Sequence, residues 1–143
     1  MAVERDDPYL RCRFVVDLGG GKTAAFQKVS GLALEIEVVE YRTGSDLLSR
    51  KLPGRPHYPN AVLRRGVTGS LGLYEWIAQV RDGDPGARRT VRIVLLNEVQ
   101  TPVMSWVLRH AWPTKYEGPT LNGTANDVAI EELVLCYDGL EVE

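Results

Sequence analysis

Few residues in this sequence have the type and spacing that catalysis or metal binding requires. The two histidines, His57 and His110, lack companions at the spacings of zinc ligands, and no CxxC pair is present. Glu131 and Glu132 are neighbours in a predicted strand, so they point to opposite faces and cannot work as a paired acid and base. Nothing marks a Ser or Cys as a nucleophile beside a positioned base. We therefore expect no enzyme activity, no metal and no cofactor.

Three other features of possible chemical interest have plainer interpretations. The GKT run at 21–23 resembles the end of a phosphate loop, but the glycine needed five residues earlier is Val16 and no helix follows. We interpret it as a hairpin turn. His110 falls on the apolar face of a predicted strand, which favours a packed ring. Arg64 and Arg65 alternate in a predicted strand and so form no single phosphate-binding face; we expect them to make ion pairs.

Composition indicates one globular domain covering residues 1–143. Hydrophobic residues make up 44% and charged residues 25%, and the net charge is −2. A pI of about 5.7 argues against a dedicated nucleic-acid binder, which is usually basic. The N-terminus is charged and carries no apolar signal region, so we expect a cytoplasmic protein without a signal peptide. In that reducing compartment Cys12 and Cys136 should be unpaired structural residues.

Alternation of apolar and polar residues predicts strands over most of the chain. The predicted strands cover 10–18, 25–29, 32–41, 61–67, 90–97, 103–112 and 128–137, with a change of phase near Val38 and Val39. Strand 103–112 should end at Pro113, which cannot donate a ladder hydrogen bond. The expected fold is a mainly β antiparallel barrel or sandwich.

One flanking α-helix is predicted over about residues 70–82. Thr68 or Ser70 is available to cap its start, and Gly83 suits its end. Apolar residues at helical spacing should pack one face of this helix against the core: Leu73, Trp76, Ile77 and Val80.

The segment 43–60 is predicted to be a long irregular loop. Its prolines at 53, 56 and 59 argue against a central strand or a helix, and loops of this length tend to be functional. The segment is basic and also carries large apolar residues, which suit a contact better than a solvated tether. We predict an assembly element that becomes ordered on a neighbouring copy, with Glu35, Glu37 and Glu131 as candidate acidic partners. Its proposed contact residues are Leu47, Leu48, Arg50, Lys51, Leu52, Pro53, Gly54, Arg55 and Tyr58.

Several predicted strands are apolar on both faces. In 90–97 the apolar residues 91, 93 and 95 alternate with 94 and 96, and 133–137 is similar. A monomeric antiparallel sheet usually exposes one face to water. The pattern therefore indicates burial against another copy of the chain.

An ordered series of short motifs spans nearly the whole chain. The series runs DPYL at 7–10, RF at 13–14, VSGL at 29–32, EYRxG at 40–44, KLPG at 51–54, YPN at 58–60, LxRGV at 63–67, Trp76, AWPxK at 111–115, GPxLN at 118–122, AIE at 129–131 and LxL at 133–135. In this order and spacing, the motifs resemble the inner tube proteins of contractile phage tails and of phage tail-like contractile injection systems. These proteins are similar to the type VI secretion tube protein.

The resemblance implies a ring-forming structural protein. Six subunits would form a hexameric ring whose sheets join into one inner barrel, and the rings would stack into a hollow tube. The implied partners are other copies of the chain, a surrounding sheath protein, baseplate or spike proteins and tube-terminating proteins, with protein cargo or DNA possible in the lumen. The particle would assemble in the cytoplasm of a bacterial cell, without membrane insertion of the subunit. Residues 51–54 resemble the family segment that reaches a neighbouring subunit or ring.

Two departures from the family pattern are small: Thr43 replaces a common acid and Tyr74 a common Trp. The alternative from a different class is a monomeric β-barrel that binds a small ligand in an interior cavity. The sequence leaves open whether the tube belongs to a phage tail or to an injection system. It also leaves open the cargo, and whether this is the bulk tube subunit or a baseplate-proximal ring.

Overall fold

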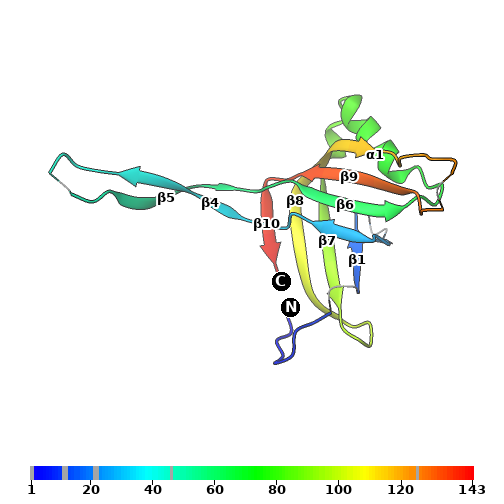
Figure 1. Cartoon of the computed structure of the whole chain (residues 1–143), viewed down its shortest axis with the longest axis horizontal. Coiled ribbons are helices and arrows are strands. Elements are labelled where there is room, and N and C mark those ends of the chain that lie inside the picture. The colour runs from blue at the N-terminus through cyan, green and yellow to red at the C-terminus, as the bar shows by residue number, and fades with distance from the viewer. Residues whose placement is uncertain (1, 11–12, 21–22, 46, 125) are drawn as a thin grey trace.

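The computed structural model describes residues 2–10, 13–20, 23–45, 47–124 and 126–143. Antiparallel strands dominate, and one α-helix flanks them (Figure 1). The elements are β1 (Phe14–Asp17), β2 (Thr23–Ala24), β3 (Lys28–Ser30), β4 (Glu35–Tyr41), β5 (Arg50–His57), β6 (Ala61–Gly66), α1 (Gly72–Arg81), a 3₁₀ turn (Pro85–Ala87), β7 (Arg89–Leu96), β8 (Pro102–Glu117), β9 (Ile130–Cys136) and β10 (Gly139–Val142). The predicted mainly β fold with one helix is confirmed.

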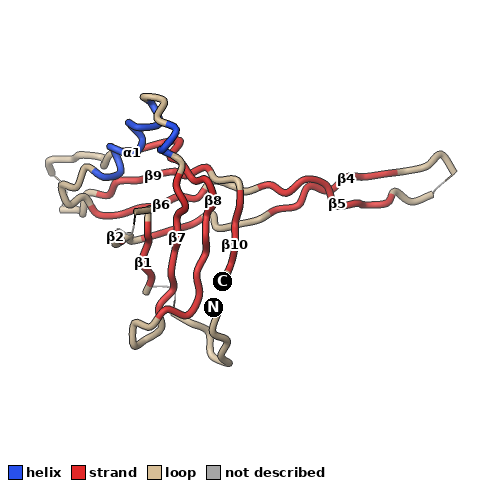
Figure 2. Tube along the Cα trace, turned by 180° about the vertical axis from the view of Figure 1, so that it is seen from behind, coloured by secondary structure: helices blue, strands red, loops and turns tan. Residues whose placement is uncertain are grey.

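Two sheets share the long strand β8. The strand order is β2-β1-β7-β8-β9-β6-β3, and β10 pairs with the other edge of β8. The first part of β8 pairs with β7 and β10, and its last part pairs with β9. In Figure 2 the strands β1, β7, β8 and β10 are aligned along one axis, and β9 and β6 lie across that axis. We call these the axial sheet (β1, β7, β8, β10) and the cross sheet (β3, β6, β9 and the end of β8).

The prediction that β8 would end at Pro113 is wrong. Pro113 pairs with Leu135, and the register with β9 shifts between Pro113 and Lys115. A proline is tolerated in a strand where the ladder is interrupted, because no hydrogen bond is lost there. The strand therefore continues from the axial sheet into the cross sheet.

The prediction of a packed ring at His110 is also wrong. Between the pairs Val91 with Leu108 and Arg89 with Ala111, β8 has one residue more than β7. His110 has a positive φ of 53° at this bulge. The extra residue changes which face each side chain occupies, so Leu108 and Ala111 are both buried while His110 is exposed. Its Nδ1 lies 2.8 Å from Asp138 Oδ1.

The helix covers one end of the core formed between the two sheets. It spans Gly72–Arg81, as predicted, and ends at Asp82 before Gly83, whose φ is 79°. The N-cap residue, Leu71, makes no side-chain capping bond. Ser70 Oγ accepts a long hydrogen bond of 3.4 Å from the Gly72 amide. Within the core cluster the fully buried side chains come from both sheets and the helix: Val16, Ala61, Leu63, Leu73, Trp76, Val91, Leu108, Ala111, Leu133 and Leu135.

β4 and β5 form a two-stranded ribbon, where the sequence predicted an irregular loop over 43–60. β4 and β5 pair only with each other in the sheet topology, and the ribbon projects far from the body (Figure 1). The prediction of an irregular loop is wrong for this segment, although β5 is not a central strand. Pro56 pairs with Ile36 and Pro53 with Val38, across a register shift. Each strand of an isolated ribbon has an open outer edge, so a proline nitrogen facing outward costs no ladder bond.

Two strands near the chain ends differ from the sequence-based prediction. β1 covers Phe14–Asp17, where the sequence predicts a strand over 10–18, and β10 lies beyond the last predicted strand, 128–137. Cys12 lies outside the described residues, and Cys136 is half-buried with no disulfide. The expectation of reduced structural cysteines stays a prediction.

Candidate assembly surfaces

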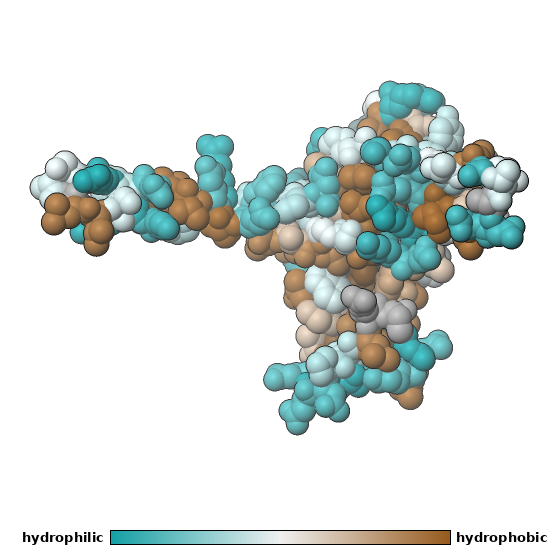
Figure 3. Space-filling view, in the orientation of Figure 1, coloured by the Kyte–Doolittle hydropathy of each residue, from teal (hydrophilic) through white to brown (hydrophobic). Residues whose placement is uncertain are grey.

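The ribbon, which we call the arm (residues 34–57), exposes apolar side chains on both faces. All residues of β4 are exposed, and the turn between the strands carries Leu47 and Leu48 at 92% and 81% exposure. Figure 3 shows apolar and polar groups side by side along the arm. The other large apolar residues exposed on it are Leu34, Ile36, Val38, Val39, Tyr41 and Leu52. Exposure of this many large apolar side chains on one element is typical of a protein contact surface.

Charged residues alternate with the apolar ones along the arm. Lys51 lies opposite Glu40 in the register, and Arg50 and Arg55 are also exposed. Gly54 permits the two strands to approach closely, since a Cβ there would lie 2.9 Å from Val39 Cγ2. The sequence-predicted contact residues from Leu47 to Arg55 are therefore brought together on the arm, away from the body.

Tyr58, by contrast, belongs to the root of the arm. Its ring packs against Tyr137, with ring centroids 5.8 Å apart, and the Tyr137 hydroxyl donates to the Gly31 carbonyl at 2.9 Å. Gly31 has a φ of 84°, and a Cβ there would clash with the Asn60 carbonyl oxygen. Only glycine fits where these two segments of the chain approach so closely. The arm is thus anchored firmly at its base.

The axial sheet presents a polar face on the side opposite the core. Arg92 Nη1 lies 2.9 Å from Glu143 Oε2, and Arg109 Nη2 lies 2.9 Å from Glu141 Oε2. The hydrogen bond from Arg109 lowers the pKa of the Glu141 carboxyl. Between these pairs Ser105 is fully buried, as is its neighbour Val107. This face is therefore a layer of paired charges over small side chains.

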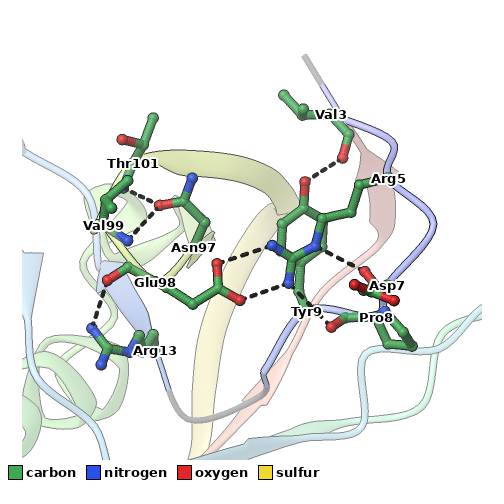
Figure 4. Close-up of polar contacts among 10 residues, drawn as sticks. All are labelled: Val3, Arg5, Asp7, Pro8, Tyr9, Arg13, Asn97, Glu98, Val99 and Thr101. Atoms are coloured by element: carbon green, nitrogen blue, oxygen red, sulfur yellow. Dashed lines mark hydrogen bonds and ion pairs between the residues drawn. The ribbon is translucent and has the colours of Figure 1, made fainter.

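The N-terminal segment folds back onto the turn between β7 and β8 in an arrangement that we call the clasp (residues 3–9 and 97–101; Figure 4). Arg5 donates to both carboxylate oxygens of Glu98, at 2.7 and 2.9 Å. The same guanidinium donates to the carbonyls of Asp7 and Pro8 and lies 3.9 Å from the centre of the Tyr9 ring. The segment is further joined to β8 because the Val3 amide donates to the Val103 carbonyl.

The turn within the clasp has its own internal support. Asn97 Oδ1 accepts from the amides of Val99 and Thr101, at 3.0 and 2.9 Å. The bidentate bond from Arg5 lowers the pKa of Glu98 from its ordinary 4.5 to about 2. Glu98 therefore remains ionised, and the clasp closed, in mildly acidic solution. Sequence reasoning did not find this pair, because no local pattern joins residues 93 positions apart.

The cross sheet carries one buried and one exposed ion pair at adjacent positions. Arg64 pairs with Glu132 at the surface, and Arg65 pairs with Glu131 inside, at 2.6 Å. The Tyr116 hydroxyl also donates to Glu131, and this bond raises the tyrosine pKa. Arg64 and Arg65 thus point to opposite faces and make ion pairs, as predicted. Glu131 is only 4% exposed, so its assignment as an acidic partner for a neighbouring copy is wrong.

The described residues hold no group of three or more side chains suited to bind a metal ion. A concavity of about 890 Å³ is an open groove on the cross sheet, not an enclosed barrel interior, whose place is taken by the packed core. Among the helices that the structure describes, none is long and apolar enough to cross a membrane.

Comparison with known proteins supports one family. The family described as T4-like virus tail tube protein gp19 matches residues 10–141. A chain in the sheath-tube complex of the PVC extracellular contractile injection system is 31% identical, with a TM-score of 0.86 over 95% of this chain and 91% of that chain. A chain in the cap of the anti-feeding prophage is 30% identical, with a TM-score of 0.88 over 100% and 95%.

More distant structures share the fold. Hcp1 from Flavobacterium johnsoniae is 12% identical, with a TM-score of 0.58 over 91% of this chain and 94% of that one. No curated protein sequence matches the chain. The match to the family over residues 10–141, together with the 30% and 31% identities over nearly the whole chain, shows that this protein belongs to the T4-like tail tube family and is a structural tube subunit.

Proposed function

We propose that six copies of this chain form a ring, and that the rings stack into the hollow inner tube of a contractile injection machine. A sheath around the tube would contract and drive it through a target envelope, with baseplate and tube-terminating proteins at its ends. Relatives at 28–32% identity come from the PVC sheath-tube and terminator complexes and from the anti-feeding prophage baseplate and cap. Their similarity favours an extracellular injection device over a phage tail.

The observation that carries this proposal is the arm. Its apolar side chains are exposed on both faces, although the strands that hold them are regularly paired. Burial of apolar surface stabilises a contact by about 25 cal/mol per Å². A second copy that covers the arm would therefore be held to it by burial of these side chains. A monomeric ligand-binding barrel has no use for such an extension.

The axial sheet supports ring closure. Its outer strands are β10 on one side and β1, extended by the short β2, on the other. Pairing of these edges between copies would remove open edges, as closed barrels do. The helix and the cross sheet lie on the core face and make that side the bulkier one. In a closed ring the bulkier side takes the larger radius, so the ion-paired face would line the channel.

The experiment that tests this proposal is assembly of the purified chain. We expect hexamers by light scattering and stacked rings with an open channel by negative-stain or cryo-electron microscopy. A single monomer species at high protein concentration, with neither rings nor tubes on the grid, would contradict it. Co-expression with a sheath protein from the same operon should then yield sheathed tubes, and analysis of tube contents would identify protein or DNA cargo.

A further inference from the structure

The loop between β8 and β9 contains the one Asn-Gly step of the sequence, Asn122 followed by Gly123. Its described residues from Gly118 to Thr124 belong to no helix or strand, and Asn122, Gly123 and Thr124 are all exposed to solvent. The tube function proposed above gives this step no role. Its chemistry is nevertheless distinctive, because an amide carbon and a backbone nitrogen lie close together there along the chain.

The side chain of Asn122 is held by two hydrogen bonds. Its Oδ1 accepts from the Thr124 amide at 3.1 Å and from the Thr124 hydroxyl at 2.9 Å. Both donors draw electron density from the side-chain carbonyl, which makes Cγ of Asn122 a better electrophile. They also lie where negative charge would develop on Oδ1 if a nucleophile added to Cγ, so they stabilise that addition.

The nucleophile is the backbone nitrogen of Gly123. Its attack on Cγ of Asn122 closes a five-membered ring, which requires rotation of the backbone around this step. Glycine permits the widest range of backbone conformations. The surroundings also leave room, because a Cβ built at position 123 would meet nothing within 4 Å. The step therefore combines an activated carbonyl with an unhindered nitrogen.

We propose that Asn122 is a self-modification site, at which the subunit deamidates without an enzyme. The Gly123 nitrogen bonds to Cγ as its proton passes to hydroxide. The bond from Cγ to Nδ2 breaks, and Nδ2 takes up a proton and leaves as ammonia, which gives a cyclic imide. Water then opens the ring at either carbonyl and yields aspartate or isoaspartate at position 122. No electron transfer occurs, and the reaction does not depend on ring formation.

The modification changes the charge of an exposed loop. Each conversion adds one negative charge to a chain whose net charge is −2. Where the ring opens to aspartate, the two donors of Thr124 face a carboxylate in place of an amide, and hydrogen bonds to a charged acceptor are the stronger kind. The aspartate product therefore keeps the turn. The isoaspartate product lengthens the backbone by one carbon and alters it.

Two other asparagines provide controls within the same chain. Asn97 Oδ1 also accepts two backbone hydrogen bonds, but Glu98 follows it. Asn126 is exposed, but Asp127 follows it. In both cases the side chain of the next residue crowds the attacking nitrogen and narrows the rotation of the backbone. Neither a bonded carbonyl nor exposure alone should therefore suffice for deamidation.

Incubation of the purified chain in heavy-oxygen water tests the proposal, because hydrolysis in that solvent labels each new carboxylate. Peptide mass spectrometry that separates aspartate from isoaspartate then locates the label. At pH 9 we expect label at position 122 in both products, and less at pH 6, since the attacking nitrogen must lose its proton. Positions 97 and 126 should react at least about tenfold more slowly, equivalent to about 1.4 kcal/mol of activation free energy. Absence of label at 122, or equal rates at the three positions, would overturn the proposal.

A matched variant tests the role of the nucleophile. Gly123→Ala places its Cβ in open space, so the melting temperature should not change. Its deamidation at Asn122 should nevertheless slow at least about tenfold, and an unchanged rate would contradict attack by this nitrogen.

The role of the hydroxyl donor is tested separately. Thr124→Val keeps the amide donor and removes the hydroxyl, and it should slow the reaction about threefold, a small factor because water can replace a donor at an exposed site. Thr120→Val, in the same loop, is the control and should react at the rate of the unmodified chain. Equal rates in the two threonine variants would show that the Thr124 hydroxyl does not activate Asn122.

Discussion

The arm and the clasp are both exposed extensions of the body, but they differ in where their interactions are satisfied. The clasp is held by five contacts of Arg5 within the same chain. The arm has a regular backbone ladder but leaves its large apolar side chains in water. An element whose polar groups are bonded within its own chain can serve as a rigid part of the subunit. An element whose apolar groups remain exposed is suited to form an interface.

The largest expected effect is that of removing the arm. Replacement of residues 36–56 by a short Gly-Ser turn should abolish tubes while the body stays folded, because β4 and β5 pair only with each other. Pelleting measures the yield of tubes, and circular dichroism of the soluble subunit shows whether the body is folded. Tubes at normal yield from the shortened chain would show that the arm is not needed for assembly.

Hydrogen exchange should show the next largest difference. Amides of the arm should exchange at least about tenfold more slowly in tubes than in free subunits, because assembly suppresses local opening of the ribbon. Clasp amides, such as Val3 and Thr101, are already bonded within the chain and should change little. Equal protection of the arm in both states would show that neighbours do not stabilise it.

A smaller loss is expected from the two leucines at the turn of the arm. Leu47→Lys with Leu48→Lys should reduce tube yield at least about tenfold, because burying even one leucine stabilises by about 1.5–3 kcal/mol and a factor of ten corresponds to about 1.4 kcal/mol. A control pair, Leu121→Lys with Val128→Lys, changes exposed residues elsewhere on the body. If both pairs reduce the yield equally, the effect is one of added charge and not of arm contacts.

The smallest effect is expected at the clasp. The pKa of Glu98 is about 2 in the folded chain and ordinarily 4.5, so its ion pair stabilises the clasp above about pH 4.5 and is lost as pH falls through 2. Clasp amides should therefore stay protected at pH 4 and exchange faster near pH 2. In Arg5→Ala they should exchange faster at pH 7 with little change in the melting temperature. Arg81→Ala, which breaks an exposed pair with Asp82, is the control.

Residues that the sequence located correctly are those governed by local periodicity. The stripe from Leu73 to Val80 fixed the helix because its side chains repeat every 3.6 residues. Alternation placed most strands of the body, and the ordered motifs indicated the family.

Tertiary structure decided the features that depend on pairing between distant segments. The prolines at 53 and 56 allow a strand only because β5 lies in an isolated ribbon with an open edge. His110 is exposed only because β8 has an extra residue opposite β7. Arg5 and Glu98 meet only because the N-terminal segment folds beneath the β7–β8 turn. Sequence periodicity reports which residues suit a surface, but which surfaces meet depends on the register and curvature of the completed sheets.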